Sequence, residues 1–257
     1  MKTLGIIGAG WLGIRLAHHF RNQYEIHVTT RTADKFDSLQ QHDFHPTLIQ
    51  FTGEEVQSTL LPWSLLPNID VLIVTVNFSK RTAIDVLSNR FENINRYLKS
   101  FNQQMFLMSS IGIYPQVEGL VEEDTLPDTA LQPNIWSVEQ LMRKHFPQIN
   151  ILRLGGLMGD DRYLSKYKIS EPAQVANHIH YEDIALVIDR MIQLELHGKT
   201  YNIVTPEHPP KQAILDQQLG HTASTPVPEP FGRIVSSKKM QTELAYTYTH
   251  PDPRFFK

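Results

Sequence analysis

The amino-acid sequence predicts a doubly wound α/β fold with a parallel sheet and a small C-terminal lobe. Short apolar runs alternate with helical patterns over most of the 257 residues, which is the arrangement of repeated strand–helix–strand units. A glycine-rich turn follows the first apolar run, and a proline-rich segment begins at Thr205. A chain of this length can bury a full core in one large domain or in one domain with an appended lobe.

The predicted strands are short apolar runs separated, in most cases, by helices. The first helix is predicted at about residues 10–20. Another is predicted within residues 81–101, because apolar side chains recur there every three or four positions and form one buried stripe. The stripe consists of Ile84, Leu87, Phe91, Ile94 and Leu98. The strands cover residues 4–7, 26–28, 48–51, 71–74, 105–108, 151–154 and 201–204.

The regular alternation fails after Arg153. A glycine-rich turn and a polar stretch at 163–172 precede a helix at about 181–194. Because prolines are frequent from Thr205 onward, we expect a small, loop-rich lobe there. These prolines include Pro209, Pro210, Pro226, Pro228 and Pro230. We assign residues 1–155 and 174–204 to the core, and residues 156–173 and 205–257 to the smaller lobe.

The composition is that of an ordinary globular protein. Hydrophobic residues make up 41% and charged residues 20%, and the net charge of -3 gives no electrostatic reason to expect nucleic acid or an anionic membrane as the main partner. Cysteine is absent, which excludes disulfides and cysteine-ligated metals. We find no signal-peptide pattern and no apolar segment as long as a membrane span, and we therefore expect a cytoplasmic protein. The sequence does not predict the oligomeric state.

Histidine is the one metal-ligating residue type that stands out in number. The twelve histidines are scattered along the chain, and the adjacent His18 and His19 point to different sides of a helix. We therefore expect no metal site.

Gly8, Gly10 and Gly13 form a G-x-G-x-x-G motif between the first predicted strand and the first helix. Gly8 permits the tight turn, Gly10 lets the backbone approach a pyrophosphate, and Gly13 lets helix and strand pack closely. The first N–H groups of the helix and its positive dipole end then face the phosphates. In this context the motif predicts a Rossmann fold that binds a nicotinamide dinucleotide.

The residues after the second strand favour NADP over NAD. The acidic residue that would take the ribose 2′-hydroxyl of NAD is missing, and Thr30 and Arg31 stand there instead. Arg31 can pair with a 2′-phosphate, and Lys35, one helical turn later, adds a second positive charge. We expect Trp11, Leu12, Thr75 and Ser109 to complete the cofactor site.

Five segments in matching order carry a resemblance to a known family. They are G-A-G-W-L-G at 8–13, S-S-I-G-I-Y-P at 109–115, L-R-L-G-G-L-M-G at 152–159, I-H-Y-E-D-I-A at 179–185 and Y-N-I-V at 201–204. With them, the chain resembles the extended short-chain dehydrogenase/reductase superfamily, and within it the atypical YeeZ-like members described as NAD-dependent epimerase/dehydratase-like. The resemblance implies a Rossmann core, a small C-terminal substrate lobe, a cleft between them, and a nicotinamide near a serine of the fifth strand.

The resemblance implies that Ser110 is the substrate-facing serine, with Tyr114 four residues later. The superfamily also implies a tyrosine followed four residues later by a lysine, whose charge lowers the phenol pKa for proton exchange. None of the nine tyrosines is followed by lysine at that spacing. Anchoring on Glu139 puts Leu131 and Ile135 at the two positions, and neither can carry a proton.

Three explanations of the missing dyad remain open. In the first, another group replaces the tyrosine, either Tyr114 or a residue of the segment after Gly159. In the second, the chain is a non-catalytic NADP(H) sensor or interaction protein. In the third, the substrate supplies its own acid or base. The candidates of the segment after Gly159 are Tyr163, Lys166, Tyr167 and Lys168.

Other polar residues near the expected cleft are given structural roles. His180, beside Asn177, His178 and Asp183, is expected to be a hydrogen-bonded packing residue more often than a proton donor, and Arg153 is expected to be structural. Lys238, Lys239 and Arg254 make the C-terminal lobe locally basic, and a solvated face is the preferred interpretation. The leading hypothesis is an oxidoreductase or sugar-nucleotide-type epimerase/dehydratase with a small-molecule substrate. The alternative is the NADP(H) sensor.

Overall fold

The computed structural model describes residues 1–78, 81–221 and 229–257, so Pro226 and Pro228 lie outside the described residues. The chain forms two compact units. The first unit comprises residues 1–113, 132–152 and 195–199. The second unit comprises residues 114–131, 153–194 and 200–257.

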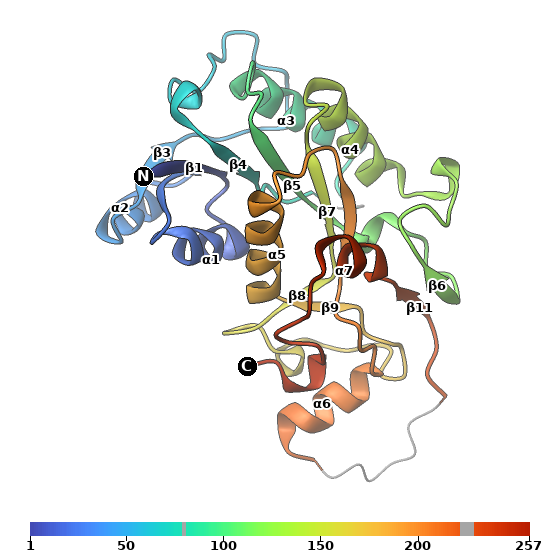
Figure 1. Ribbon diagram of the computed structural model, residues 1–257. Coiled ribbons are helices and arrows are strands. Elements are labelled where there is room, and N and C mark those ends of the chain that lie inside the picture. Colours follow the sequence, from blue (N-terminus) through green and yellow to red (C-terminus); the bar gives the residue numbers. More distant parts are fainter. Residues whose placement is uncertain (79–80, 222–228) are drawn as a thin grey trace. The chain divides into compact units, whose positions relative to one another are not determined.

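The first unit is built on parallel strands in the order β5-β4-β1-β2-β3, which belong to a sheet of seven strands (Figure 1). The chain order reverses between β1 and β4, which is the switch point of a doubly wound fold. The predicted α/β fold with a parallel sheet is therefore confirmed. The strands are β1 (Lys2–Ile7), β2 (Tyr24–Thr30), β3 (His45–Leu48), β4 (Val71–Val74) and β5 (Gln104–Ser110), followed by β7 (Asn150–Leu154).

Four helices accompany these strands. They are α1 (Trp11–Phe20), α2 (Ala33–Gln41), α3 (Ile84–Tyr97) and α4 (Pro133–His145). Helices α3 and α4 pack side by side, whereas α1 and α2 contact β1, β2 and β3 (Figure 1). Leu87, Phe91 and Ile94 form the buried face of α3, as the apolar stripe predicted. Ile84 is 46% exposed, because it begins the helix before the first turn reaches the core.

Element boundaries differ from the predictions most clearly at β3 and α3. The third strand runs from His45 to Leu48, so only Leu48 of the predicted residues 48–51 lies in it, although the Ile49 N–H still donates to the Thr30 carbonyl oxygen at 2.8 Å. The helix predicted within 81–101 ends at Tyr97. Ser100 adopts a positive φ of 74°, which interrupts the helical backbone.

The second unit contains short strands and three helices within its described residues. β6 pairs with β11 and β8 pairs with β9, both in parallel. The proline-rich segment is more regular than expected, because Pro210 immediately precedes a helix, where the missing N–H costs nothing, and Gly220 ends that helix at φ +68°. The elements are β6 (Gly119–Val121), β8 (Gly156–Met158), β9 (His178–His180), α5 (Tyr181–Gln193), β10 (Thr200–Ile203), α6 (Lys211–Leu219), β11 (Arg233–Val235) and α7 (Lys238–Leu244).

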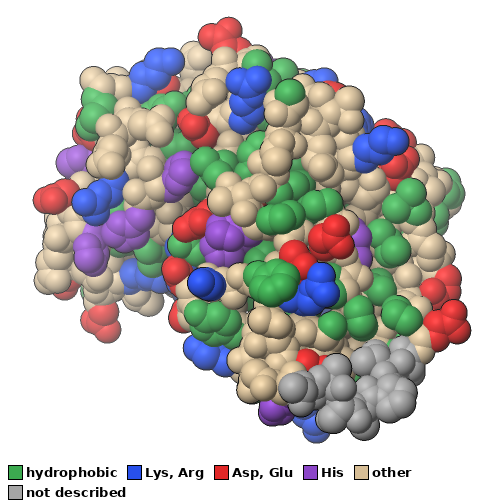
Figure 2. All heavy atoms as spheres, turned by 60° about the horizontal axis from the view of Figure 1, so that its bottom comes forward, with side chains coloured by type: hydrophobic (Ala, Val, Ile, Leu, Met, Phe, Trp, Pro, Cys, Tyr) green, Lys and Arg blue, Asp and Glu red, His purple; other side chains and the backbone are tan. Residues whose placement is uncertain are grey.

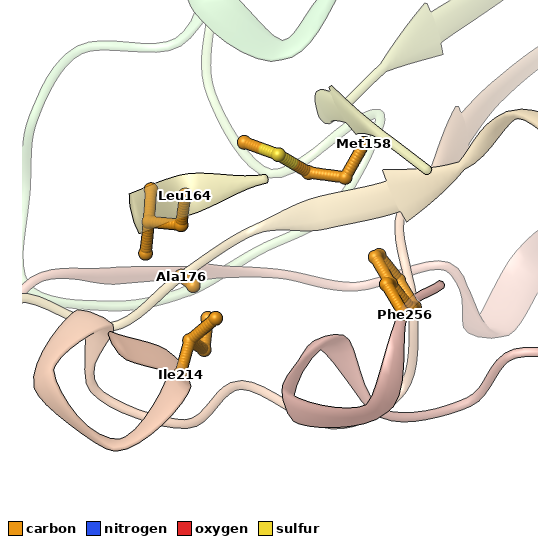
Figure 3. Packing of buried hydrophobic residues seen from close by; sticks show 5 residues of the cluster. All are labelled: Met158, Leu164, Ala176, Ile214 and Phe256. Carbon is orange, nitrogen blue, oxygen red and sulfur yellow. The ribbon is translucent and has the colours of Figure 1, made fainter. Parts of the chain in front are cut away.

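A small apolar cluster holds the end of the chain in the second unit. Figure 3 shows its buried side chains, which come from β8, a 3₁₀ turn, the segment before β9, helix α6 and the C-terminal segment. Ile169 and Leu215 pack against it. Burial of this cluster fixes the backbone of the last residues against β8 and β9. Its members are Met158, Leu164, Ala176, Ile214 and Phe256.

On the face drawn in Figure 2, acidic and basic side chains are interspersed with hydrophobic and other polar ones. Within residues 1–78, 81–221 and 229–257, no helix combines the length and the apolar character that crossing a bilayer requires.

Candidate functional site

The glycine turn between β1 and α1 is held by two threonines. Gly8 has φ +112°, a conformation that side chains disfavour. Its N–H donates to the Thr29 hydroxyl at 2.9 Å, and the Thr75 hydroxyl donates to its carbonyl oxygen at 2.6 Å. Strands β2 and β4, which flank β1, thus fix the turn from both sides.

Gly10 and Gly13 have different environments within the same turn. A Cβ on Gly13 would lie 2.1 Å from the Gly8 carbonyl oxygen, so helix α1 approaches the turn too closely for any side chain. A Cβ on Gly10 would meet no atom within 4 Å. The space before Gly10, at the N-terminus of α1, is therefore open, as an approaching diphosphate requires.

A cavity of about 800 Å³ opens beside this turn, within the first unit. Six of the predicted cofactor residues line it: Gly8, Gly10, Thr30, Arg31, Lys35 and Thr75. The remaining lining includes Thr29, Thr32, residues 49–54, Val76, Asn77, Val86 and Arg90. The cavity is large enough for much of a dinucleotide.

Four predicted cofactor residues lie outside this lining. Leu12 and Gly13 are buried. The Trp11 ring lies under the Arg15 guanidinium, 3.8 Å from the ring centroid. Ser109 is buried at the end of β5, where its hydroxyl donates to Glu139 Oε1 of α4 at 2.6 Å. Their cofactor roles remain predictions.

The cavity carries more positive than negative charge. Arg31 is exposed just after β2, Lys35 lies on α2, and Arg90 of α3 lines the same cavity, against one carboxylate, Glu54. Arg90 is not predicted from the sequence, because only the packing of α3 shows which cavity its side chain borders. The basic excess suits a ligand with several phosphates.

Ser110, the predicted substrate-facing serine, ends β5 half-buried. Its Oγ accepts a hydrogen bond from the Gly112 N–H at 3.0 Å. As an acceptor in this bond, the hydroxyl retains its own proton for donation. The structure thus places Ser110 where a hydroxyl can act as a donor, and its catalytic role stays a prediction.

Tyr114, the second predicted catalytic residue, is buried in the second unit and 2% exposed. Its hydroxyl donates to Asn202 Oδ1 at 2.7 Å and accepts from Arg153 at 2.9 Å. Burial raises the pKa of the Tyr114 phenol, and the neighbouring Arg153 guanidinium offsets this only in part. The direction is opposite to the lowering that the tyrosine of a Tyr–Lys dyad requires.

The positions aligned with the missing dyad hold apolar side chains. Leu131 and Ile135 are both buried. In the segment after Gly159, Lys166 donates to the Asp161 carbonyl oxygen at 2.8 Å and lies over the Tyr163 ring. Tyr167 and Lys168 are exposed.

Asn177, His178 and His180 lie at or beside β9. The Asn177 amide donates to the Arg233 carbonyl oxygen at 2.9 Å and accepts from the Val235 N–H at 2.7 Å, which joins β9 to the segment of β11. Burial lowers the pKa of His178 to about 4. His180 lies close to Glu182 and His250, a grouping that the linear sequence concealed because His250 is distant along the chain.

The chain is similar to a known protein over nearly its whole length. The chain is 24% identical to the protein YeeZ of Escherichia coli strain K12, with 98% of both chains covered. The YeeZ-like resemblance is thereby confirmed. No protein-family model matches the chain.

Two solved structures illustrate the shared fold. A provisionally assigned NAD-dependent epimerase/dehydratase from Methylobacillus flagellatus superposes with a TM-score of 0.72 at 21% identity, covering 98% of this chain and 94% of that one. The dTDP-glucose 4,6-dehydratase of Bacillus anthracis, in complex with NAD, superposes with a TM-score of 0.71 at 15% identity, covering 99% and 94%. Both likenesses concern the fold.

Proposed function

We propose that the chain binds NADP(H) in the cavity of the first unit and acts as an atypical short-chain dehydrogenase/reductase. The reaction would be an oxidoreduction, epimerisation or dehydration of a small carbonyl or hydroxyl compound such as a nucleotide sugar. One observation carries the proposal: the glycine turn and the cations Arg31, Lys35 and Arg90 line the same cavity.

The cavity fits the cofactor at two separate points. The open space at Gly10 accepts a diphosphate against the first N–H groups of α1, where the helix dipole favours negative charge. Arg31 and Lys35 supply the charge for a 2′-phosphate at the end of β2. The cofactor, when bound, supplies the hydride chemistry; the residues of the chain bind and orient it.

A direct test of the cofactor assignment compares Arg31→Ala with Arg21→Ala, which removes an exposed arginine outside the cavity. A charge-assisted hydrogen bond contributes about 1.5 kcal/mol at its lower, solvent-screened limit, so Arg31→Ala should weaken NADP binding about tenfold. NAD binding should change little, and Arg21→Ala should change neither. Equal losses for NADP and NAD in calorimetric titrations would refute the 2′-phosphate assignment.

Ser110 is the group of the chain that we assign to the substrate. The hydrogen bond from the Gly112 N–H uses an oxygen lone pair of Ser110 and not its proton, so the hydroxyl can still donate to a substrate. We infer that Tyr114 does not replace the missing tyrosine, because its hydroxyl already serves Asn202 and Arg153 and burial raises its pKa. NADPH consumption over a panel of carbonyl compounds and nucleotide sugars tests this activity, with Ser110→Ala as the comparison.

The second candidate function is a non-catalytic NADP(H) sensor. The engaged hydroxyls of Ser109 and Tyr114, and the apolar Leu131 and Ile135, favour it, because none of these groups offers the usual proton exchange. Tight NADP(H) binding without turnover across a broad panel would favour the sensor over the enzyme.

A further inference from the structure

The second unit brings together two imidazoles and one carboxylate. His180 ends β9, Glu182 lies in the first turn of α5, and His250 follows α7. One ligand atom from each lies within 4.8 Å of the other two. Two histidines and a glutamate are a donor set that holds zinc with one position left open.

The hydrogen bonds of His180 determine which ring nitrogen presents a lone pair. Its Nε2 lies 3.1 Å from the main-chain oxygen of Lys257, which can only accept, so Nε2 carries the proton. Its Nδ1 is then the acceptor, as the 3.4 Å contact from the Glu182 N–H also indicates. A carbonyl that fixes the tautomer in this way is the usual outer partner of a metal-binding histidine.

The two oxygens of Glu182 have separate partners. Oε1 accepts from the Tyr181 hydroxyl at 3.3 Å. Oε2 faces both histidines, 2.6 Å from His250 Nε2 and 3.8 Å from His180 Nδ1. Because His180 Nδ1 and Glu182 Oε2 are both acceptors, no hydrogen bond can join them. The Nδ1 lone pair receives the weak 3.4 Å contact from the Glu182 N–H, so a cation that binds both Nδ1 and Oε2 would replace that contact.

The backbone that carries His250 is fixed by Asp183, which is fully buried. Asp183 accepts from the N–H groups of Thr249 and His250 at 2.8 and 3.0 Å, and from the Tyr246 hydroxyl at 2.7 Å. Three hydrogen bonds to Asp183 thus hold the segment of His250 near α5, and the two carboxylates of the first turn offset the positive end of the helix dipole.

Apolar and close contacts hold the His180 ring from its other sides. Phe256 packs edge-on against it at a centroid distance of 5.3 Å, and the same phenylalanine is anchored in the apolar cluster of Figure 3. A Cβ on Gly159 would lie 2.4 Å from His180 Nε2, so the glycine leaves the ring its space. An apolar wall around a ligand limits the access of water to it.

We propose that His180, Glu182 and His250 bind a divalent transition-metal ion, with zinc as the ion that the donor set fits best. The ligand atoms are His180 Nδ1, Glu182 Oε2 and His250 Nε2, and the ion replaces the proton shared by Glu182 and His250. This site revises the expectation that the scattered histidines form no metal site. It is independent of the proposed NADP(H) function, which rests on the first unit.

The experiment measures zinc affinity on the full chain, purified without a histidine tag and stripped with a chelator. Titration against a chromophoric chelator should give one zinc per chain. His250→Gln and Glu182→Gln should each lower the affinity at least tenfold. The matched control is His45→Gln, which removes an exposed histidine that also contacts a glutamate, Glu25, at 3.4 Å; it should keep the wild-type affinity.

Circular dichroism shows whether each variant is folded. If His250→Gln does not fold, the result for Glu182→Gln decides, because this substitution removes a half-buried charge while keeping the shape of the side chain. Cobalt in place of zinc should give the visible absorption of a four-coordinate site in the wild-type chain and in His45→Gln. The proposal is overturned if the folded wild-type chain binds no zinc. It is equally overturned if folded Glu182→Gln binds zinc as tightly as the wild type does.

Discussion

Gly10 and Gly13 belong to one motif, yet their substitution is expected to damage different properties. In Gly13→Ala the new Cβ would lie 2.1 Å from the Gly8 carbonyl oxygen and 2.9 Å from the Thr75 hydroxyl. The first neighbour is backbone in a turn fixed by Thr29 and Thr75, so helix α1 must shift. Overpacking of this kind costs about 3 kcal/mol, at the upper end of its usual range.

For a chain of this size each kcal/mol lowers Tm by roughly 2–4 °C, so Gly13→Ala should melt about 6–12 °C below the wild type. Gly10→Val should melt within about 4 °C of it. Gly10 has φ -76° and ψ -171°, which any residue adopts, and its Cβ would meet no atom within 4 Å. The expected cost is that of a poorer N-cap, about 1 kcal/mol or less.

Nucleotide binding should show the reverse order. The valine side chain at residue 10 would extend into the cavity and occupy the space proposed for the diphosphate. Differential scanning fluorimetry and calorimetric titration with NADP, run on both variants below their melting ranges, measure the two properties. A Gly10→Val chain that binds NADP with unchanged affinity would remove the glycine turn from the site, and a Gly13→Ala chain as stable as the wild type would refute the packing argument.

Three further predictions concern buried or half-buried polar groups. Tyr114→Phe leaves Asn202 Oδ1 without its 2.7 Å donor, so the substitution should lower the free energy of unfolding by about 1–3 kcal/mol and Tm by several degrees. An unchanged Tm together with lost turnover would instead indicate a catalytic role for Tyr114. Ser109→Ala removes the 2.6 Å hydrogen bond to buried Glu139 and should destabilise by a similar amount in denaturant melts. Ser110→Ala should cost less, because the Gly112 N–H that loses its 3.0 Å acceptor is only half-buried and can bond to water instead. Burial lowers the pKa of His208 below 6.5, so the folded chain favours the neutral ring and loses stability as pH falls below 6.5. His208→Gln should make the free energy of unfolding fall less steeply in that pH range. Profiles of stability against pH that run parallel for the variant and the wild type would contradict the assignment.

The strength of local signals explains which parts of the fold could be predicted from the sequence. The unit of β1, turn and α1 was predictable because apolar periodicity and the glycines agree over residues 4–20. The end of β3 was not, since residues 48–51 are apolar enough for a strand but leave the sheet after Leu48 to line the cavity. Helix α6 is not predicted, because frequent prolines indicate loops, although Pro210 stands where a helix begins.

The candidate site was predictable to the extent that its residues are neighbours in sequence. Arg31 and Lys35 follow a strand whose end the motif had already marked, so their position beside the cavity could be expected. Arg90 comes from another helix, and only the packing of α3 brings it to the cavity. The same holds for His250, which reaches Glu182 through the hydrogen bonds of Asp183.

The hydrogen-bond partners of the polar residues also bear on where proton transfer can originate. A hydroxyl that both donates and accepts inside the core has no proton to offer a substrate, and Tyr114 is in that state. The buried hydroxyl of Ser109 already donates its hydrogen bond to Glu139. Ser110 differs, because the Gly112 N–H engages its oxygen and leaves the proton available. If the chain is an enzyme, Ser110 is therefore the residue of the serine–tyrosine segment from which a substrate can receive a hydrogen bond.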